Sequence, residues 1–406
     1  LEIFAQNPEY SAKLDSLINA KDKVPFKIFD KKNAEKLFGK NLNISASQLE
    51  KFNLCRFSYF CNYGLNVRER QRAEINSMQY GTIVHYILER FFGEYTKEEY
   101  LSLEEDKFQK IVCAYLAEYA VKYFGEEQLE SNSFTYRLKT ILDNVMYLMK
   151  HIMEELSQSE FFVADCELKI GEDIPSYTIV LPDGHKIAVC GSVDRVDIMQ
   201  RADITYLRII DYKTGTKQFK LSDILYGINL QMLLYLHSIE ASGGDKYGEI
   251  VPAGILYMPA TVPYISSDSL KSIDKLPDEL NKKLKMNGLL LKDTEIIHGM
   301  DKTDVATYIP VKIKAGEPVS STSLATLAEF GKIFKKVDML IAEMGKNIYN
   351  GNIEAKPLKG GHDSCEYCPY DSVCAYRQSN PITCFSVDNK TVIEEITNEI
   401  NGKEEE

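Results

Sequence analysis

The stretch KIAVCGSVDRVDIMQRADITYLRIIDYKTG, residues 186–215, contains two candidate strands joined by a short polar connection. We expect one strand over 186–199 and a second over 206–212, because both are rich in β-branched and aromatic residues. A short connection is typical of antiparallel neighbours in a sheet. We therefore expect Asp194 to stand beside Asp211 across this hairpin.

Two adjacent carboxylates are costly unless a cation or a proton lies between them. Hard oxygen ligands of this kind suit Mg²⁺ or Mn²⁺. Lys213 shares a strand face with Asp211, so its ammonium can orient a water or meet developing negative charge. Asp211 and Lys213 taken alone fit a surface salt bridge as well. Asp197 points to the face opposite Asp194, and we expect it to pair with Arg195.

The same pattern of secondary structure extends on both sides of this hairpin. A helix over about 221–240 followed by a strand over 250–259 predicts an α/β crossover onto a mixed sheet. Ser47 and Glu50 form a candidate capping box for a helix that runs to Cys55. Residues 262–318 are irregular, with a short helix and one strand pair. Further strands are expected over 161–170 and 177–181, and further helices over 80–92, 97–125, 133–157 and 322–348.

Two helical motifs carry residues of possible chemical use. Gly81 and His85 lie one turn apart, so His85 is a candidate third metal ligand, although a lone helical histidine is more often a surface residue. Gln231 and Tyr235 share a face by the same spacing, and an amide with a phenol can bind a phosphate or a base. Each motif alone is weak.

Four of the nine cysteines have the spacing of a metal or iron–sulfur site. Cys55 stands alone, whereas Cys365, Cys368 and Cys374 form the run Cys-x-x-Cys-x-x-x-x-x-Cys, so a shared site would join the two ends of a domain. Structural zinc, the alternative, usually takes two close pairs of ligands. The other five, including Cys61, are expected to be small apolar residues. The odd count and the lack of a secretory segment favour a reducing, cytoplasmic location.

Length and composition set the remaining bounds. A chain of 406 residues forms one large domain or two, and its net charge of −12 argues mildly against broad nucleic-acid binding. No apolar run approaches the roughly 20 residues of a membrane span. No Gly-x-x-x-x-Gly-Lys-Ser/Thr loop occurs, so ATP binding by that route is not expected. We expect a connector over 1–44, one domain over 45–380, and an acidic tail over 381–406 that is disordered or docks on a missing part.

In this order, the motifs resemble those of the RecB-type PD-(D/E)XK nucleases: Gly-x-x-x-His, Gly-x-x-Asp-Arg, Asp-Tyr-Lys-Thr-Gly and Gln-x-x-x-Tyr. The resemblance implies an α/β fold, a restriction-endonuclease-like mixed sheet flanked by helices, here with helical insertions. It implies a DNA exonuclease that uses Mg²⁺ or Mn²⁺. The residue roles implied are metal ligation by His85, Asp194, Asp211 and the Tyr212 carbonyl, catalysis by Lys213, and DNA binding or site support by Gln231 and Tyr235.

The cysteine layout is similar to that of the AddB subunits of bacterial helicase–nucleases, although Arg56 stands where that family usually has proline. This resemblance implies a [4Fe-4S] cluster on the four cysteines and an AddA-like helicase–nuclease partner. It also implies trimming of unwound single strands, chiefly the 5′-ended one, at double-strand breaks. The chain begins at Leu1, so we expect an excised nuclease domain. The alternatives are a Cas4-like or free-standing RecB-like exonuclease, usually much shorter, and a non-catalytic module that binds DNA ends.

Overall fold

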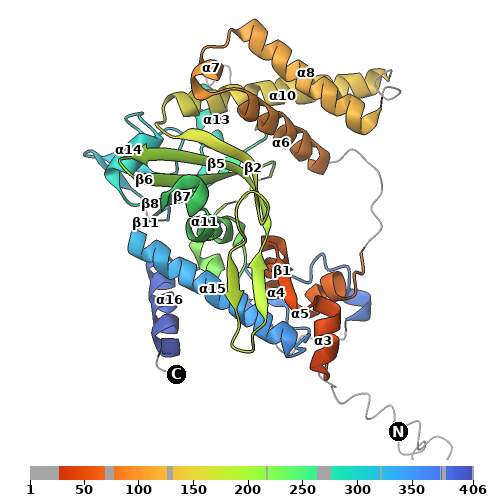
Figure 1. Cartoon of the computed structure of the whole chain (residues 1–406). Coiled ribbons are helices and arrows are strands. Elements are labelled where there is room, and N and C mark those ends of the chain that lie inside the picture. The colour runs from red at the N-terminus through yellow and green to blue at the C-terminus, as the bar shows by residue number, and fades with distance from the viewer. Residues whose placement is uncertain are drawn as a thin grey trace, which may run out of the picture.

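The computed structural model describes residues 27–68, 77–125, 131–215, 218–262, 276–320, 322–374, 376 and 381–404 (Figure 1). Its centre is a six-stranded mixed sheet, in which β2, β5 and β6 are antiparallel neighbours and β6 runs parallel to β7. This confirms the expected α/β class with a mixed sheet. In spatial order the strands are β11 (Leu324–Ala325), β8 (Asn287–Leu291), β7 (Glu249–Pro259), β6 (Ile204–Lys213), β5 (Gly191–Arg201) and β2 (Phe162–Ile170).

The expectation of a single strand over 186–199 is wrong, because the chain passes from one sheet to another at Cys190. Strand β4 (Lys186–Val189) belongs to a second sheet, where it pairs with β3 (Thr178–Val180) and, in parallel, with β1 (Asn41–Ile44). The backbone N–H of Cys190 donates to the carbonyl of Ile44 (2.9 Å), and β5 then starts at Gly191 in the central sheet.

Helices cover both faces of the central sheet (Figure 1). The expected helix over 80–92 is confirmed within α6. The helix over 97–125 is divided in two, because the first helix ends with its C-cap at Ser102 and the backbone is extended at Glu104 before the second begins. One face carries α6 (Ser77–Glu94), α7 (Lys97–Leu101), α8 (Glu105–Phe124) and α10 (Asn132–Ser157), and the other carries α11 (Gln231–Ser242), α12 (Gly244–Tyr247) and α15 (Leu327–Tyr349).

Helix α11 supplies the expected crossover between the parallel strands β6 and β7. The helix expected over 221–240 is nevertheless divided, because a 3₁₀ turn, η2 (Leu221–Tyr226), ends at Gly227 with φ 69°. The first capping box is also shifted by two residues: Ser45 and Gln48, rather than Ser47 and Glu50, cap α4. The helices that follow it are α4 (Ala46–Leu54), α5 (Arg56–Tyr59) and a π-helical turn, η1 (Phe60–Gly64).

The segment over 262–318 contributes more than the expected short helix and strand pair. Strand β8 joins the central sheet beside β7, where Gly288 is required, because a Cβ there would lie 2.0 Å from the carbonyl oxygen of Ile255. Residues 263–275 of this segment lie outside the described part of the chain. The other elements are α13 (Leu276–Leu284), α14 (Thr294–Met300), β9 (Lys312–Lys314) and β10 (Glu317–Val319).

Both ends of the described chain are folded onto the domain. Within the expected connector, α3 (Lys31–Phe38) contacts α15, and β1 joins a sheet, whereas residues 1–26 lie outside the described part. Within the expected tail, α16 (Asn389–Glu404) packs on α15 and fully buries Val392 and Ile396, so this part is not a disordered extension. Among the described residues, no helix combines the length and the apolar character that a membrane crossing requires.

A fully buried ionic network fixes the central hairpin to α10. Arg195 forms two 2.7 Å hydrogen bonds with Asp197, as the sequence predicts, and a 3.0 Å bond with Glu155 of α10. Arg208 on β6 completes the network, donating to Asp197 (3.0 Å) and Glu155 (2.6 Å). The four side chains are 0% exposed, and their two positive and two negative charges balance.

A second ion pair ties α11 to α15. The His237 ring stacks on Phe334 at 4.7 Å between centroids, and its Nε2 lies 3.0 Å from Oδ1 of Asp338. The Tyr177 hydroxyl donates to the same oxygen (2.8 Å). Burial opposes protonation, but the bonds to Asp338 and Glu240 outweigh it and raise the pKa of His237 to about 9.

This raised pKa predicts a pH dependence of stability. The folded state holds the His237 proton more tightly than the unfolded chain, whose histidine titrates near ~6.5. The contribution is therefore complete below pH ~6.5 and is lost as the pH rises through about 9. We expect the free energy of unfolding, measured in urea, to fall between these two pH values by on the order of 2 kcal/mol more in wild type than in His237→Gln. If the free energy of unfolding changed with pH by the same amount in both proteins, this expectation would be contradicted.

Candidate functional site

Strand register brings three carboxylates into one row at the edge of the central sheet. Arg195 pairs with Ile210, so the next positions outward along β5 and β6 are Asp194 and Asp211. The backbone N–H of Tyr212 donates to Oδ2 of Asp194 (2.9 Å), which holds that carboxylate beside β6. The expected adjacency of Asp194 and Asp211 is thus present in the structure.

Glu167 is the third carboxylate, and the sequence analysis did not identify it. It lies on β2 between the pairs Cys166–Arg195 and Leu168–Val193, and therefore opposite Asp194. Its φ of 50° is unusual for a non-glycine residue in a strand. The Ser192 hydroxyl donates to its Oε2 (2.8 Å). The sequence predicts a strand over 161–170 and so places Glu167 in it. It does not show that the register of this strand puts Glu167 opposite Asp194.

Helix α6 contacts β2 and β6 and places His85 over these carboxylates. Nδ1 of His85 lies 3.0 Å from Oε1 of Glu167, and Nε2 lies 3.7 Å from Oδ2 of Asp194. One ligand atom from each of the three residues falls within 4.8 Å of the other two. The structure therefore brings His85 to Asp194, as the Gly-x-x-x-His motif suggested.

The pKa values in this group reflect burial and mutual charge. Burial, followed by the charge of Asp211, raises the pKa of Asp194 to about 7. Burial opposes protonation of His85, but the bond to Glu167 and the charge of Asp194 raise its pKa. Burial acts against ionisation of Glu167, yet the bonds from His85 and Ser192 lower its pKa. The group is thus a compact set of carboxylates around one imidazole.

Asp211 is the most deeply placed of the carboxylates. It is 1% exposed, and the Lys213 ammonium forms an ion pair with its Oδ2, whereas its Oδ1 has no hydrogen-bond donor among the described residues. Lys213, the next residue on this face, lies with its Nζ 5.9 Å from the centroid of the Tyr257 ring. A buried carboxylate oxygen without a donor is rare in folded proteins. The Asp211 oxygens and the mixed carboxylate and imidazole donors fit a divalent cation such as Mg²⁺ or Mn²⁺.

The surroundings of the remaining motif residues are more typical of a structural role. Tyr235 is buried, and a Cβ on Gly191 would lie 2.2 Å from its hydroxyl, so Gly191 leaves room for this ring. Gln231 is the partly exposed first residue of α11. A Cβ on Gly81 would make only an ordinary 3.7 Å contact with Thr214, so the packing there does not require glycine.

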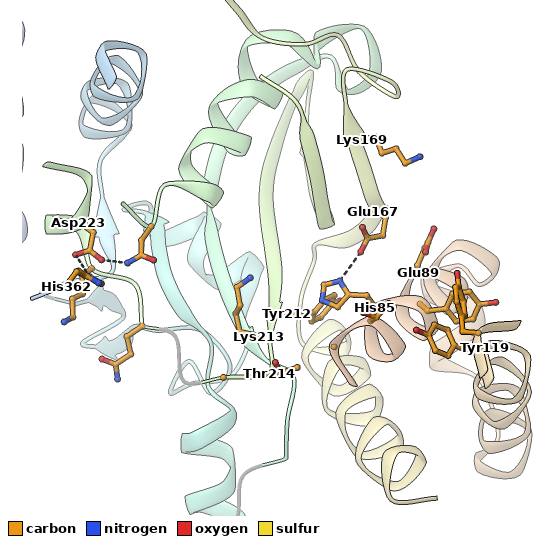
Figure 2. Close-up of a pocket in the computed structure, with 18 residues that line it drawn as sticks. His85, Glu89, Tyr119, Glu167, Lys169, Tyr212, Lys213, Thr214, Asp223 and His362 are labelled. Atoms are coloured by element: carbon orange, nitrogen blue, oxygen red, sulfur yellow. Dashed lines mark hydrogen bonds and ion pairs between the residues drawn. The ribbon is translucent and has the colours of Figure 1, made fainter. Parts of the chain in front are cut away.

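A cavity of about 1310 Å³ opens over this group (Figure 2). In Figure 2, Lys213 and Thr214 lie on one side of His85 and Tyr119 of α8 on the other, while Asp223 and His362 mark the far end. Oδ1 of Asp223 lies 3.8 Å from Nε2 of His362. A cavity of this volume has room for a chain-like substrate to pass His85, Glu167 and Lys213. Its lining comprises Gly81, Thr82, His85, Tyr86, Glu89, Tyr119, Tyr123, Glu167, Lys169, Tyr212, Lys213, Thr214, Gly215, Gln218, Lys220, Asp223, Asn229 and His362.

The structure gathers the cysteines that the sequence singles out. Cys55 is buried at the end of α4, and Cys368 and Cys374 pack against the small cluster it belongs to. Burial raises the pKa of Cys374, and the charges of Cys368 and Cys365 act in the same direction. Cys61, expected to be a plain apolar residue, is buried in the same cluster. The segment 365–374 thus packs against the end of α4, the helix that precedes Cys55.

Few other contacts among the described residues hold this segment. Strand β12 (Leu358–Gly360) pairs with β13 (Ile382–Cys384), and a 3₁₀ turn, η4 (Asp371–Val373), lies between them. The Tyr370 hydroxyl donates to the carbonyl of Val67 (2.7 Å). All nine cysteines are free thiols. Clustered thiols with few other contacts fit the four-cysteine ligand set of an iron–sulfur cluster.

Comparison with known proteins gives consistent matches. A model described as the PD-(D/E)XK nuclease superfamily matches residues 43–375. An ATP-dependent helicase/deoxyribonuclease subunit from Clostridium kluyveri (strain NBRC 12016) is 35% identical over 397 residues, covering 94% of this chain and 34% of the relative. The protein of the same name from Thermoanaerobacter sp. (strain X514) is 34% identical over 354 residues, covering 84% and 30%. The chain thus spans about a third of the length of these relatives.

Proposed function

The chain belongs to the PD-(D/E)XK nuclease superfamily, and from this membership we propose that it hydrolyses phosphodiester bonds of DNA with a divalent cation. The observation that carries the proposal is the buried Asp211 carboxylate beside Asp194: its Oδ2 forms an ion pair with Lys213, whereas its Oδ1 has no hydrogen-bond donor among the described residues. Such an arrangement is costly in a purely structural role. A cation among these oxygens would remove that cost.

His85, Asp194 and Asp211 are the proposed ligands, and the Tyr212 carbonyl stays a further candidate. Glu167 is proposed to orient His85, because its bond to Nδ1 leaves the Nε2 lone pair directed toward Asp194. When bound, Mg²⁺ or Mn²⁺ neutralises phosphate charge and makes a water more acidic. Tyr235 supports the site under Gly191, and Gln231 stays a candidate DNA contact.

Lys213 is proposed as the catalytic lysine. Its side chain is partly exposed to the cavity and is held by Asp211 on one side and the Tyr257 ring on the other. An ammonium in this position can orient the attacking water and stabilise the negative charge that develops on the phosphate. Asp211 thus has two roles, because it binds the cation and positions the lysine.

The proposed substrate is single-stranded or unwound DNA, and the proposed act is exonucleolytic trimming, chiefly of the 5′-ended strand, in double-strand-break repair. The relatives are named as subunits of an ATP-dependent helicase/deoxyribonuclease, and these names support a helicase-containing assembly with an AddA-like partner over a free-standing or Cas4-like nuclease. The cytoplasmic location stays a prediction.

The four cysteines Cys55, Cys365, Cys368 and Cys374 are proposed to hold a [4Fe-4S] cluster. It would join residues that are more than 300 positions apart in the chain. The segment from β12 to β13 also carries His362 into the cavity, so the cluster would help to hold one end of the cavity in place.

We expect Cys368→Ser to lose iron and to lower the free energy of unfolding by about 3 kcal/mol, since a cross-link over a long loop is removed. Cys113→Ser, a partly exposed cysteine on α8, is the matched control. Iron content and thermal unfolding of anaerobically purified proteins provide the measurement. Equal iron content and equal unfolding temperatures in the two variants would rule out the cluster's role.

Incubation with end-labelled DNA tests the proposed function. The chain, without ATP, is given a single-stranded or a duplex oligonucleotide labelled at its 5′ or 3′ end, in Mg²⁺, Ca²⁺ or EDTA. We expect cleavage of the single strand in Mg²⁺ only, with the 5′ label released first. Bound but uncut DNA in Mg²⁺ would instead support the non-catalytic end-binding module, and the absence of both binding and cutting would reject both functions.

A further inference from the structure

One wall of the cavity is aromatic and comes from helices α6 and α8 rather than from the strands that carry Asp194 and Asp211. Tyr86 follows His85 on α6, and Tyr119 and Tyr123 lie one turn apart on α8. The Tyr119 ring lies 4.4 Å from that of Tyr123 at an interplanar angle of 34°, and 5.2 Å from that of Tyr86. We refer to Tyr86, Tyr119 and Tyr123 as the tyrosine wall.

The wall is firmly supported on its inner side and open on its outer side. Tyr119 is 4% exposed, and the Tyr86 hydroxyl donates to Glu118 (2.7 Å). Tyr123, in contrast, is 55% exposed, and it lines the same cavity as His85, Glu167 and Lys213. The Lys122 ammonium lies over the Tyr123 ring at 5.2 Å from the centroid. A large exposed ring on a rigid base is a suitable surface for another flat group.

The rings of the wall, rather than its charges, indicate which part of a nucleic acid it receives. Glu89 lines this end of the cavity, but Glu118 beside Tyr86 is paired with Arg90, and Lys122 lies over the Tyr123 ring, so opposite charges are mixed there. The flat face of Tyr123 suits a base ring more than a phosphate. Exposed aromatic rings stack with bases of any sequence, which suits an enzyme that removes successive nucleotides.

From this arrangement we infer that Tyr123, supported by Tyr119, is a stacking subsite for one unpaired base of the DNA strand whose phosphodiester lies at Asp194 and Asp211. The inference rests on the proposed function. It assigns to α8 the task of holding the strand beside the point of cleavage, since one continuous cavity is lined by the wall and by His85, Glu167 and Lys213, which adjoin these carboxylates. Duplex DNA does not offer this base, so the subsite favours unwound strands.

Binding of single strands that carry one 2-aminopurine, scanned along the oligonucleotide, tests this inference. Ca²⁺ replaces Mg²⁺, so that binding is measured separately from cleavage. We expect one position to be quenched in wild type and in Tyr123→Phe but not in Tyr123→Ala, with the dissociation constant raised about 10-fold in the alanine variant. Tyr136→Ala is the matched control, because Tyr136 is 73% exposed on α10 and does not line the cavity.

An abasic nucleotide at the quenched position completes the test. It should weaken binding to wild type and have no further effect on Tyr123→Ala, because the same contact has already been lost. Equal affinity and equal quenching in wild type and Tyr123→Ala, in a chain that cleaves single strands, would overturn the subsite and leave the proposed function standing. A wild-type chain that neither binds nor cleaves single strands would overturn both.

Discussion

Replacing Asp197 with asparagine is expected to lower the free energy of unfolding by about 3–5 kcal/mol. The change leaves Arg195 and Arg208 fully buried with Glu155 as their single carboxylate partner in this network. A buried charge that loses its partner keeps the whole cost of its desolvation. Since Arg195 follows Asp194 directly, we also expect the Asp194 end of β5 to lose order.

Asp203→Asn is the matched control for this prediction, because it makes the same chemical change at an exposed position in the turn of the same hairpin. Urea unfolding of both variants at neutral pH provides the measurement. If Asp197→Asn shifted the unfolding midpoint no more than Asp203→Asn, the network would not be holding the hairpin to α10.

The second large effect is on cleavage. We expect Asp211→Asn to reduce single-strand cleavage by about 10³-fold or more, because a ligand and the partner of Lys213 are both lost. In EDTA this variant should be at least as stable as wild type, because relief of the repulsion between the adjacent Asp194 and Asp211 carboxylates offsets the lost ion pair with Lys213. Loss of activity without loss of stability is the pattern expected of a functional residue.

Lys213→Ala separates cation binding from the role of the lysine. We expect it to lose about 10²-fold in cleavage while it keeps Mn²⁺ binding and DNA binding, because the carboxylates remain. Calorimetric Mn²⁺ titration and cleavage rates of wild type and both variants provide the measurement. Full activity in Lys213→Ala, or unchanged Mn²⁺ affinity in Asp211→Asn, would contradict the assigned roles.

Local pattern was enough to place the centre of the site. Asp194, Asp211 and Lys213 lie on strands joined by a short hairpin, so the strand period of two and one turn fix their relative positions. Helical spacing places His85 on the same helix face as Gly81. Its position over the strands depends on how α6 packs, and that position was expected from the resemblance of the motifs. The crossover of α11 between β6 and β7 was predictable for the same local reasons.

Non-local pairing explains what the sequence did not reveal. Glu167 faces Asp194 only in one register of β2 against β5, and an irregularity between Val163 and Asp165 sets that register. A slip of one residue would move Glu167 to the other face. The break at Cys190 was missed because it depends on the pairing of β4 with β1, about 145 residues upstream.

The most direct test of the metal site is an anomalous difference map from crystals of the chain soaked in Mn²⁺. The proposed arrangement predicts one manganese peak between the carboxylates of Asp194 and Asp211 and beside Nε2 of His85, with Glu167 bonded to the other ring nitrogen. Soaked crystals without a peak at these residues, from protein that cleaves DNA in Mn²⁺, would contradict the proposed site.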